Sequence, residues 1–345
     1  MTEAVERFET ASGGRIYRLP LDLFPGLKGY AHLVLRDDVA ALFDVGSGFG
    51  DSNEQLEAGM ATVREKFGEP VAWDSLTHIL ISHGHIDHFG GLHFVRQHTD
   101  APLGIHELDR RVLTQYEARM AYVAHRLHEF FIECGVPAEK RAELLGLYML
   151  NKQLFHSIPV DFTYEAIGMR VGELELVHVP GHCPGQIMAF VDDVLLSGDH
   201  ILELTTPHQA PEQLTLSTGL EHYIASLKFT RTLRGRVRLT LGGHEHPIHD
   251  LPGRIEQILD GHRERLQAVL KLAEKPVTMY ELSQALFTQP KGYHKLLALE
   301  EAAAHVEYLH SRGLLCLVNV DDIEHVVDVA LKFKRCEGSD HGPAF

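Results

Sequence analysis

Three histidines and one aspartate stand within six residues, in the run HGHIDH at positions 83–88. The run follows residues 76–81, an apolar segment that is typical of a buried strand. Imidazole is the commonest protein ligand for zinc-like metals, and carboxylate is a further hard donor. In a strand-to-loop turn, the first two histidines project from one side while the last two donors reach another. The run therefore suits two adjacent metal ions better than one.

The size and composition of the chain are those of an ordinary globular protein. Its 345 residues are enough for one large domain with a smaller one appended. The contents of 44% hydrophobic and 23% charged residues are ordinary and allow a substantial core. The formal net charge is −16, and a surface of that sign repels phosphate backbones. The charge therefore argues against non-specific binding of nucleic acid.

The cysteines and the N-terminus carry no sign of export. Cys134, Cys183, Cys316 and Cys336 are widely spaced and form no CxxC pair. This pattern does not predict a disulfide framework, and it fits a reducing compartment. Residues 1–6 are acidic and lack the apolar segment of a secretory signal. Because no apolar run approaches the ~20 residues that span a membrane, we expect a cytoplasmic protein without a membrane partner.

Strand-like and helical segments alternate through the first 250 residues. Residues 30–35 and 39–43 predict a hairpin, residues 52–67 predict a helix, and another helix is expected to start near His88. Strand patterns return at 173–179, 187–196 and 237–241. The alternation, without heptads or internal repeats, indicates an α/β layered fold.

Residues 107–156 interrupt this alternation with helical patterns. Apolar side chains recur at helical spacing over 107–131, and a second helical stretch covers about 138–155. These helices are either an inserted cap over the site or ordinary packing helices. The sequence leaves both interpretations open.

The last ninety residues have the pattern of a winged-helix module. Helical patterns cover about 254–273, 278–287 and 297–311, and two strand-like runs, 314–320 and 324–331, predict a hairpin. The third helix carries glutamates but no Lys or Arg between Leu297 and His310. A recognition helix needs donors for phosphates and base edges. The pattern therefore argues against DNA binding and favours a role in packing or dimerisation; a homodimer is compatible with it.

Four more candidate site residues follow strand-like segments elsewhere in the chain. They are Asp44 in DVGSG, His182 in PGHCPG, Asp199 in LLSGDH and His244 in LGGHEH. With these residues and the histidine run, the chain resembles the metallo-β-lactamase superfamily over about residues 14–250. The resemblance covers all five ordered motifs of that family. It implies an αββα sandwich, with a catalytic domain at 1–250, a winged-helix-like domain at 251–335 and a tail at 336–345.

The resemblance also implies a role for each candidate residue. The first metal ion would be held by His83, His85 and His182. The second would be held by Asp87, His88 and His244. Asp199 would bridge both ions, and Asp44 would orient a ligand histidine, so Asp44, Asp87 and Asp199 are the carboxylates expected to serve catalysis.

Two divalent ions in such a site would have a defined chemistry. They lower the pKa of a shared water, so that a bridging hydroxide exists near neutral pH and attacks a carbonyl or a phosphorus. Histidine and carboxylate ligands suit zinc, and they also suit iron and manganese. The sequence therefore predicts two divalent ions, with zinc as the first choice.

The fold family hosts many reactions, so the substrate needs separate arguments. Residues 180–185 look like the corresponding turn of glyoxalase II, and the winged-helix pattern is similar to the lactamase-β-like-2 group, which includes thioesterases. We therefore expect hydrolysis of a thioester of the acyl-CoA kind or of an ester. An endoribonuclease or phosphodiesterase is the alternative, weakened by the net charge of −16. A lactonase is a further alternative.

Overall fold

The computed structural model describes residues 4–150 and 155–338. The chain forms two compact units, each of which is described by itself. Unit 1 comprises Met1–Tyr116, Leu154–Pro207 and Leu227–Ile255. Unit 2 comprises Glu117–Gln153, His208–Ser226 and Glu256–Phe345. Most of the sequence predicted as an insertion at 107–156 therefore groups with the C-terminal residues.

The first sheet of unit 1 has seven strands whose order in space follows the chain. Strands β1 to β4 are antiparallel, and β4 to β7 are parallel. The predicted hairpin over 30–43 is confirmed as β3 and β4, which turn at Asp37 with a φ of 50°. The strands are β1 (Glu6–Glu9), β2 (Arg15–Phe24), β3 (Leu27–Arg36), β4 (Val39–Phe43), β5 (His78–Leu80), β6 (Leu103–Ile105) and β7 (Phe162–Thr163).

The second sheet of unit 1 has five strands in the order β12-β11-β10-β9-β8. The single strand expected at 187–196 is wrong, because two strands form there and Val191 pairs with Val194 across a two-residue turn. Asp192 takes a φ of 56° in this turn, a conformation that short polar side chains tolerate. The strands are β8 (Arg170–Val171), β9 (Leu174–His178), β10 (Ile187–Val191), β11 (Val194–Gly198) and β12 (Leu239–Gly242).

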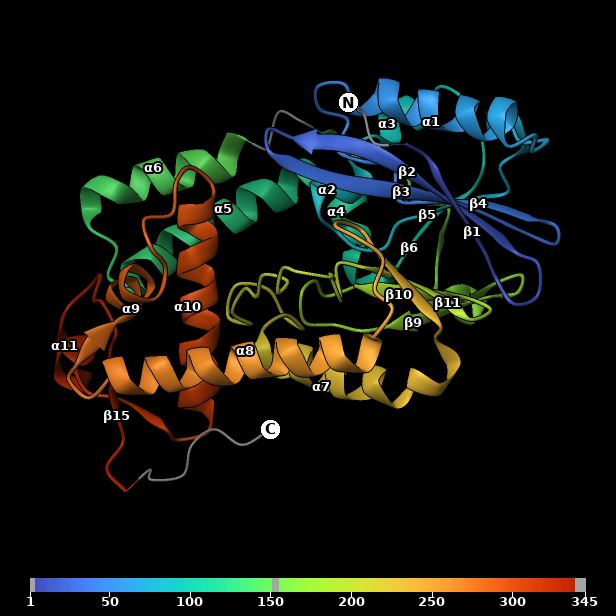
Figure 1. The fold of residues 1–345 in the computed structure, drawn as a ribbon. Coiled ribbons are helices and arrows are strands. Elements are labelled where there is room, and N and C mark those ends of the chain that lie inside the picture. Colours follow the sequence, from blue (N-terminus) through green and yellow to red (C-terminus); the bar gives the residue numbers. More distant parts are fainter. Residues whose placement is uncertain (1–3, 151–154, 339–345) are drawn as a thin grey trace. The chain divides into compact units, whose positions relative to one another are not determined.

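The core of unit 1 lies between the two sheets. One buried apolar cluster joins Phe43 and Leu80 of the first sheet to Ile187, Leu196 and Leu241 of the second. The strands alternate inward-facing apolar residues with outward-facing ones, so each sheet buries one face on the other. Helix α1 (Ser52–Lys66) covers the outer face of the first sheet (Figure 1). The prediction of an α/β layered fold is confirmed.

Helices lie between the strands of unit 1 in the sequence, although residues 117–133 and 220–226 group with unit 2. The helical pattern over 107–131 divides into separate pieces because Gln115 leaves the helical conformation, with φ −140° and ψ 39°. The pieces are η2 (Glu107–Asp109), α4 (Arg110–Thr114) and α5 (Tyr116–Glu133). The other short elements are α2 (Ile86–Phe89), α3 (Leu92–Val95), α7 (Leu220–Thr232), η1 (Trp73–Ser75), η4 (Glu165–Ile167) and η5 (Arg234–Arg236).

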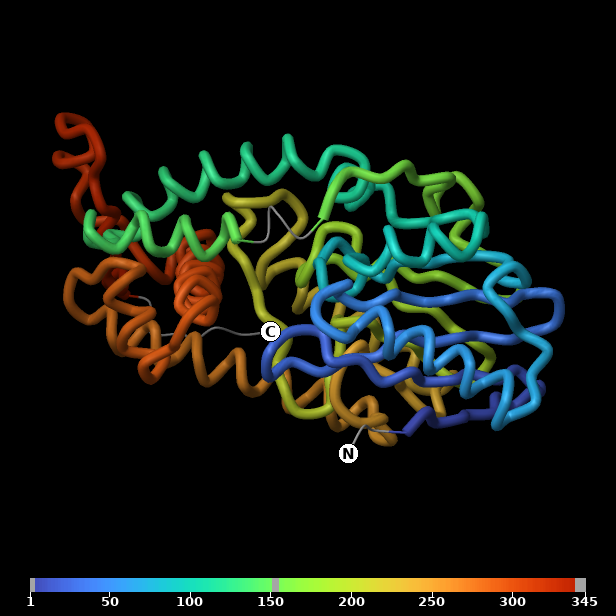
Figure 2. The backbone as a smooth tube through the Cα atoms, turned by 90° about the horizontal axis from the view of Figure 1, so that it is seen from above, coloured from blue at the N-terminus to red at the C-terminus, as the bar shows by residue number. Residues whose placement is uncertain are grey.

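Unit 2 joins helices from the middle of the chain to the C-terminal elements. Helices α5 and α6 (Ala138–Met149) lie side by side (Figure 2). The amide of Tyr280 donates to the carbonyl of Cys134 at 2.8 Å, and the amide of Leu331 donates to that of Glu133 at 2.8 Å. The C-terminal elements are α8 (Leu251–Leu272), β13 (Val277–Thr278), α9 (Met279–Leu286), α10 (His294–Ser311), β14 (Leu315–Leu317), α11 (Val320–His325) and β15 (Lys332–Arg335).

The predicted second strand of the C-terminal hairpin is wrong. Residues 324–331 form no strand. The first two of them belong to the end of α11, and β15 begins only at Lys332. The Asn319 side chain, at the start of the excursion, bonds to its C-terminal end: it accepts from the amide of Lys332 and donates to the carbonyl of Ala330, each at 2.9 Å. The strands of unit 2 form an antiparallel sheet in the order β13-β15-β14.

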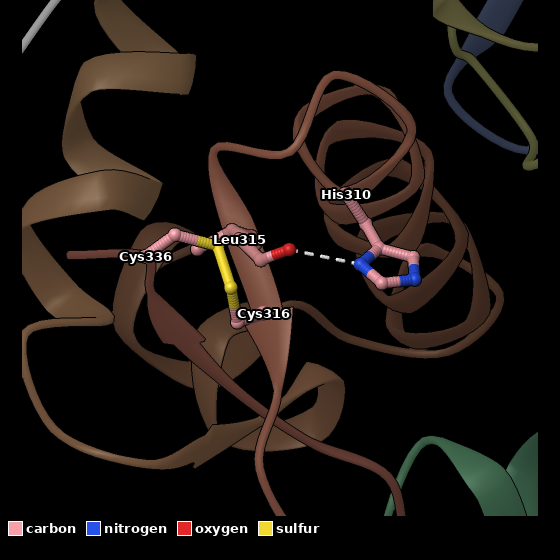
Figure 3. Close-up of a disulfide and its surroundings, with 4 residues drawn as sticks. All are labelled: His310, Leu315, Cys316 and Cys336. Atoms are coloured by element: carbon pink, nitrogen blue, oxygen red, sulfur yellow. Dashed lines mark hydrogen bonds between the residues drawn. A yellow bond between two sulfur atoms is a disulfide. The ribbon is translucent and has the colours of Figure 1, made fainter. Parts of the chain in front are cut away.

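Two of the cysteines pair, which corrects the expectation drawn from their spacing. Cys316 on β14 and Cys336, directly after β15, form a disulfide with their Cα atoms 5.3 Å apart (Figure 3). They are 20 residues apart in sequence, and the pairing of β14 with β15 brings them together. Cys134 and Cys183 are free and buried.

The glutamates of α10 are used inside unit 2. Glu301 accepts a bond from the backbone amide of Gln209 at 2.7 Å and pairs with Arg265 at 2.7 Å. Glu307 accepts from the amide of Glu212 at 3.2 Å. These bonds satisfy backbone amides that pack against α10. The glutamates of this helix are therefore used in internal contacts. The packing role expected for α10 is therefore observed.

No helix in the described residues combines the length and the apolar character needed to cross a membrane.

Candidate metal centre

The seven candidate ligands lie in loops at strand ends of unit 1. Strands β4 and β5 pair in parallel, and so do β11 and β12, so the carboxyl ends of each pair meet at one edge of a sheet. Asp44 directly follows β4, and Asp199 directly follows β11. The run at 83–88 follows β5 and enters α2, while His244 follows β12. His182 lies in the connection between β9 and β10.

Three histidines form the first group of donors. One ligand atom from each of His83, His85 and His182 lies within 4.8 Å of the other two. Nε2 of His83 is 3.1 Å from Nδ1 of His85, and the ring centroids of His85 and His182 are 4.6 Å apart. Such a group offers three nitrogen donors to one ion, which is a common ligand set for zinc.

Two carboxylates and two histidines form the second group. The donor atoms of Asp87, His88, Asp199 and His244 also lie within 4.8 Å of one another. Oδ2 of Asp87 is 3.4 Å from Nε2 of His244 and 3.7 Å from Nε2 of His88.

The Asp199 carboxylate faces both groups. Its Oδ1 is 3.4 Å from Nε2 of His88, and its Oδ2 is 3.3 Å from Nε2 of His244. The same Oδ2 is 3.9 Å from Nε2 of His182 in the first group. One carboxylate thus lies between two sets of donors.

Other residues fix the ring orientations from behind. Nδ1 of His88 donates to Oδ2 of Asp44 at 2.9 Å, and Nδ1 of His244 donates to the carbonyl of Lys28 at 2.6 Å. Ser82 donates its amide and its hydroxyl to Asp44, and its oxygen lies 2.9 Å from Nδ1 of His83. Because Nδ1 is occupied, Nε2 is the atom left to bind a metal.

Two of these supporting residues are absent from the sequence-based prediction. Ser82 directly precedes the histidine run, so its contact with the ligands could have been predicted from its position in the sequence. The Lys28 carbonyl had no such signal, because 216 residues separate Lys28 from His244 and any residue supplies a carbonyl.

Burial and charge give the two groups different electrostatic character. Burial lowers the pKa of His83 well below its usual value and that of His85 to about 3, so both rings are neutral donors. Burial opposes ionisation of Asp199, but the His244 and His88 imidazoles hold its pKa well below the usual range. Burial would also lower the pKa of His88, yet the facing carboxylates, Asp199 first, raise it well above the usual value. The second group is therefore an anionic site that favours positive charge.

The donor atoms fit divalent ions. Nε2 of His88 and Oδ1 of Asp199 are buried without a hydrogen-bond partner among the described residues. Leaving such atoms unpaired is costly, and a cation between them would satisfy both. The two groups therefore fit two divalent ions, with Asp199 able to contact each.

Several residues near the ligands in the sequence or in the fold are not part of either group. His200 is fully buried, and its Nε2 lies 2.9 Å from Oγ1 of Thr230. His246 is exposed, and Cys183 is buried outside both groups. Arg236 pairs with Glu175 at 2.6 Å.

A third group of buried donors lies in unit 2. His262, Glu301 and His305 have ligand atoms within 4.8 Å of one another. Hydrogen bonds already connect this group. Nδ1 of His262 lies 3.1 Å from Nε2 of His305, and Nδ1 of His305 donates to the carbonyl of Glu301 at 2.7 Å. We treat it as a polar network within the packing of α8 and α10.

Comparison with known proteins agrees with this geometry. The model of the metallo-beta-lactamase superfamily matches residues 25–276. The probable metallo-hydrolase YqjP of Bacillus subtilis (strain 168) is 26% identical over 295 residues, covering 81% of this chain and 86% of that protein. The probable metallo-hydrolase YqgX of the same organism is 27% identical over 182 residues, covering 51% of this chain and 68% of that protein.

Solved structures share the fold. The metallo-beta-lactamase family protein TTHA1429 from Thermus thermophilus superposes with a TM-score of 0.71 and 24% identity, covering 93% of this chain and 98% of that one. A beta-lactamase domain protein from Burkholderia ambifaria superposes with a TM-score of 0.70 and 22% identity, covering 96% of this chain and 94% of that one.

A sandwich of two sheets that carries two adjacent His/Asp donor groups at its strand ends defines a metal-binding protein of the metallo-hydrolase kind. The chain belongs to the metallo-beta-lactamase superfamily. Membership implies divalent metal ions, and the two groups of unit 1 fit them.

Proposed function

We propose that this protein is a dinuclear metal-dependent hydrolase that cleaves a carboxylic thioester or ester. His83, His85 and His182 would hold one ion, and Asp87, His88 and His244 the other. Asp199 would contact both. The nitrogen and carboxylate donors favour zinc, with iron or manganese as substitutes.

The position of Asp199 supports this proposal most directly. Its two carboxylate oxygens lie 3.3 to 3.9 Å from imidazoles of both groups. When bound, a pair of divalent ions lowers the pKa of water and stabilises the negative charge that develops on a substrate oxygen. The chain supplies the orientation: Asp44 fixes the ring of His88, and the Lys28 carbonyl fixes that of His244.

Exposed aromatic surface on the loop that follows β4 supports an apolar substrate portion. Phe49 is 41% exposed, and its ring centroid lies 5.5 Å from that of Phe24. The loop that carries Phe49 is bonded to the end of α2, because the amide of Val45 donates to the carbonyl of His88 at 2.8 Å. Such aromatic surface can contact an acyl chain. A polyanionic strand would be repelled by the net charge of −16.

Unit 2 would serve this enzyme as a winged-helix-like domain, as the sequence predicts for 251–335. Helices α8, α9 and α10 with the sheet β13-β15-β14 support that assignment. DNA binding through α10 is disfavoured, because Glu301 is only 7% exposed and already bonds within the unit.

The interpretation of 107–156 as a cap that selects the acyl group stays a prediction from the sequence. Deleting the segment is a poor test, because Leu127, Phe130 and Phe131 of α5 are buried. Tyr122 is 61% exposed on α5, so Tyr122→Ala tests the idea without removing core. An unchanged preference for acyl-chain length in this variant would argue against the cap.

The proposed reaction can be tested with one panel of substrates. Metal-replete protein is assayed with acyl-CoA thioesters of graded chain length, a p-nitrophenyl ester, a lactone and bis(p-nitrophenyl) phosphate. We expect release of free thiol from acyl-CoA that disappears in Asp199→Ala. Turnover confined to the phosphate diester would overturn the carbonyl proposal in favour of a phosphodiesterase. Turnover confined to the lactone would narrow the ester class to cyclic esters.

A further inference from the structure

A buried aspartate, Asp109, lies outside both donor groups and does not serve its own helix. It is 1% exposed and stands at the N-cap position of α4. An aspartate there ordinarily accepts a bond from an amide of the first turn. The Asp109 side chain makes no such capping bond. Its carboxylate is therefore directed to another part of unit 1.

One target of this carboxylate is the loop of the first donor group. Oδ2 of Asp109 accepts a bond from the amide of Gly84 at 2.8 Å. Gly84 is the residue between His83 and His85, so its peptide links the two ligands directly. Fixing this amide restrains the backbone on which both imidazoles are mounted.

The second target is the loop that carries the third ligand of the same group. A Cβ atom added at Gly185 would lie 2.7 Å from Cγ of Asp109, closer than side chains approach. A Cβ atom added at Gly84 would lie 3.1 Å from the same Cγ. Neither glycine has a positive φ. Both therefore provide room for the carboxylate, and Gly185 follows His182 by three residues.

We propose that Asp109 is a positioning residue that locks the His83–His85 loop against the His182 loop and so holds the three donors of the first metal ion in register. The proposal rests on the proposed metal site and adds a residue to its support. Asp109 would act on the first group as Asp44 acts on the second, where it accepts a bond from His88. Asp44 also reaches the first group through the Ser82 hydroxyl, which contacts His83, whereas Asp109 bonds to the backbone between His83 and His85.

Metal retention measures this role without any assay of turnover. Wild-type protein, Asp109→Ala and Asp109→Asn are loaded with zinc and equilibrated with chelators of graded strength, and the zinc-to-protein ratio is determined. Asp161→Ala is the matched control, because Asp161 also accepts a backbone amide in unit 1, that of Leu103 at 2.7 Å. Thermal unfolding of each zinc-free protein monitors the fold.

The outcomes separate the alternatives. We expect Asp109→Ala to weaken the binding of one of the two ions by about 10- to 100-fold, the range for lost support of a ligand. Asp109→Asn keeps an oxygen acceptor for Gly84 and should retain both ions, as should Asp161→Ala. Adding Asp44→Asn to Asp109→Ala should weaken the binding of both ions.

Three results would overturn the role of Asp109. Unchanged retention of both ions in Asp109→Ala would remove the positioning function while leaving the metal site intact. Equal losses in Asp109→Asn and Asp109→Ala would show that charge rather than the bond to Gly84 matters. Loss of both ions together with the thermal transition would assign Asp109 a purely structural role. A wild-type protein that binds no zinc would instead overturn the proposed function itself.

Discussion

Nδ1 of His88 lies 2.9 Å from Oδ2 of Asp44, although 44 residues separate the two in sequence. The contact arises because β4 and β5 pair in parallel, which places the loops that follow them at the same edge of the sheet. Asp44 holds this position with a φ of 61°. A left-handed conformation costs energy in a residue other than glycine, and such strain is concentrated at functional sites.

Asp44→Asn should lower metal affinity while leaving the fold intact. Asparagine tolerates a positive φ as well as aspartate does, so the backbone is not expected to move. The variant weakens the bond that orients His88, which should reduce the affinity for one ion by about 10- to 100-fold. Asp37→Asn is the control, because Asp37 has a φ of 50° in the exposed turn between β3 and β4. Equal affinities in both variants would contradict the role of Asp44.

Asp199→Ala should lose both metal content and turnover. The substitution removes the carboxylate that faces both donor groups, so the effect should exceed the 10- to 100-fold range of a supporting residue. Elemental analysis after gel filtration measures the metal, and the acyl-CoA assay measures turnover. Asp193→Ala is the control. Asp193 lies before β11, and its loss removes only a partly exposed ion pair with Arg238, so metal content and turnover should both stay unchanged. Full activity in Asp199→Ala would refute the proposed mechanism.

Unit 2 should become less stable as pH rises from about 6.5 to about 8.5; at lower pH the buried His262 and His305, whose pKa values burial lowers, oppose this trend. Burial raises the pKa of Glu300 to about 8 and, against the opposing Arg265, that of Glu301 to about 7. At these two carboxyl groups the folded state keeps protons that the unfolded state releases near pH 4.5, so their contribution to stability is full below that pH and is lost as pH rises through the folded pKa values.

The pH dependence can be assigned with one isosteric variant. Urea unfolding is followed by circular dichroism at several pH values for wild type, Glu300→Gln and the exposed control Glu274→Gln. The neutral amide of Glu300→Gln should flatten the decline in stability, whereas Glu274→Gln should retain it. A wild-type stability that rises over the same pH range would contradict the prediction.

The disulfide between Cys316 and Cys336 should stabilise unit 2. A cross-link that closes a loop of this length, 20 residues of sequence separation, contributes about 3 kcal/mol in the chain-entropy description. Cys316→Ser should therefore lower the free energy of unfolding by about 2–4 kcal/mol under non-reducing conditions. Thiol titration of the unfolded, unreduced wild type should find two groups, Cys134 and Cys183. Four titrated thiols would show that the pair does not form.

Local patterns predicted much of the site and of the core elements. The run at 83–88 and the motifs around Asp44, His182, Asp199 and His244 identified the residues that the structure brings together in two donor groups. They could be recognised because metal donors, glycines and strand periodicity are short-range features that survive without tertiary information. The metal roles of these residues remain predictions.

Longer-range features could not be predicted in this way. The excursion between β14 and β15 and the Cys316–Cys336 pair both depend on which strands lie side by side. Strand pairing joins residues that are distant in the chain, and single-sequence patterns carry no information about partners.

The sequence by itself determined the chemistry available to this protein: the donor types, their strand-end positions and the α/β alternation. Only the tertiary structure decided how the donors are divided and supported. It placed Asp199 between two groups, directed Asp44 to His88 and turned Asp109 toward Gly84. Residue identity is local, whereas the direction of a carboxylate follows from the packing of sheets and loops that meet only when the chain has folded.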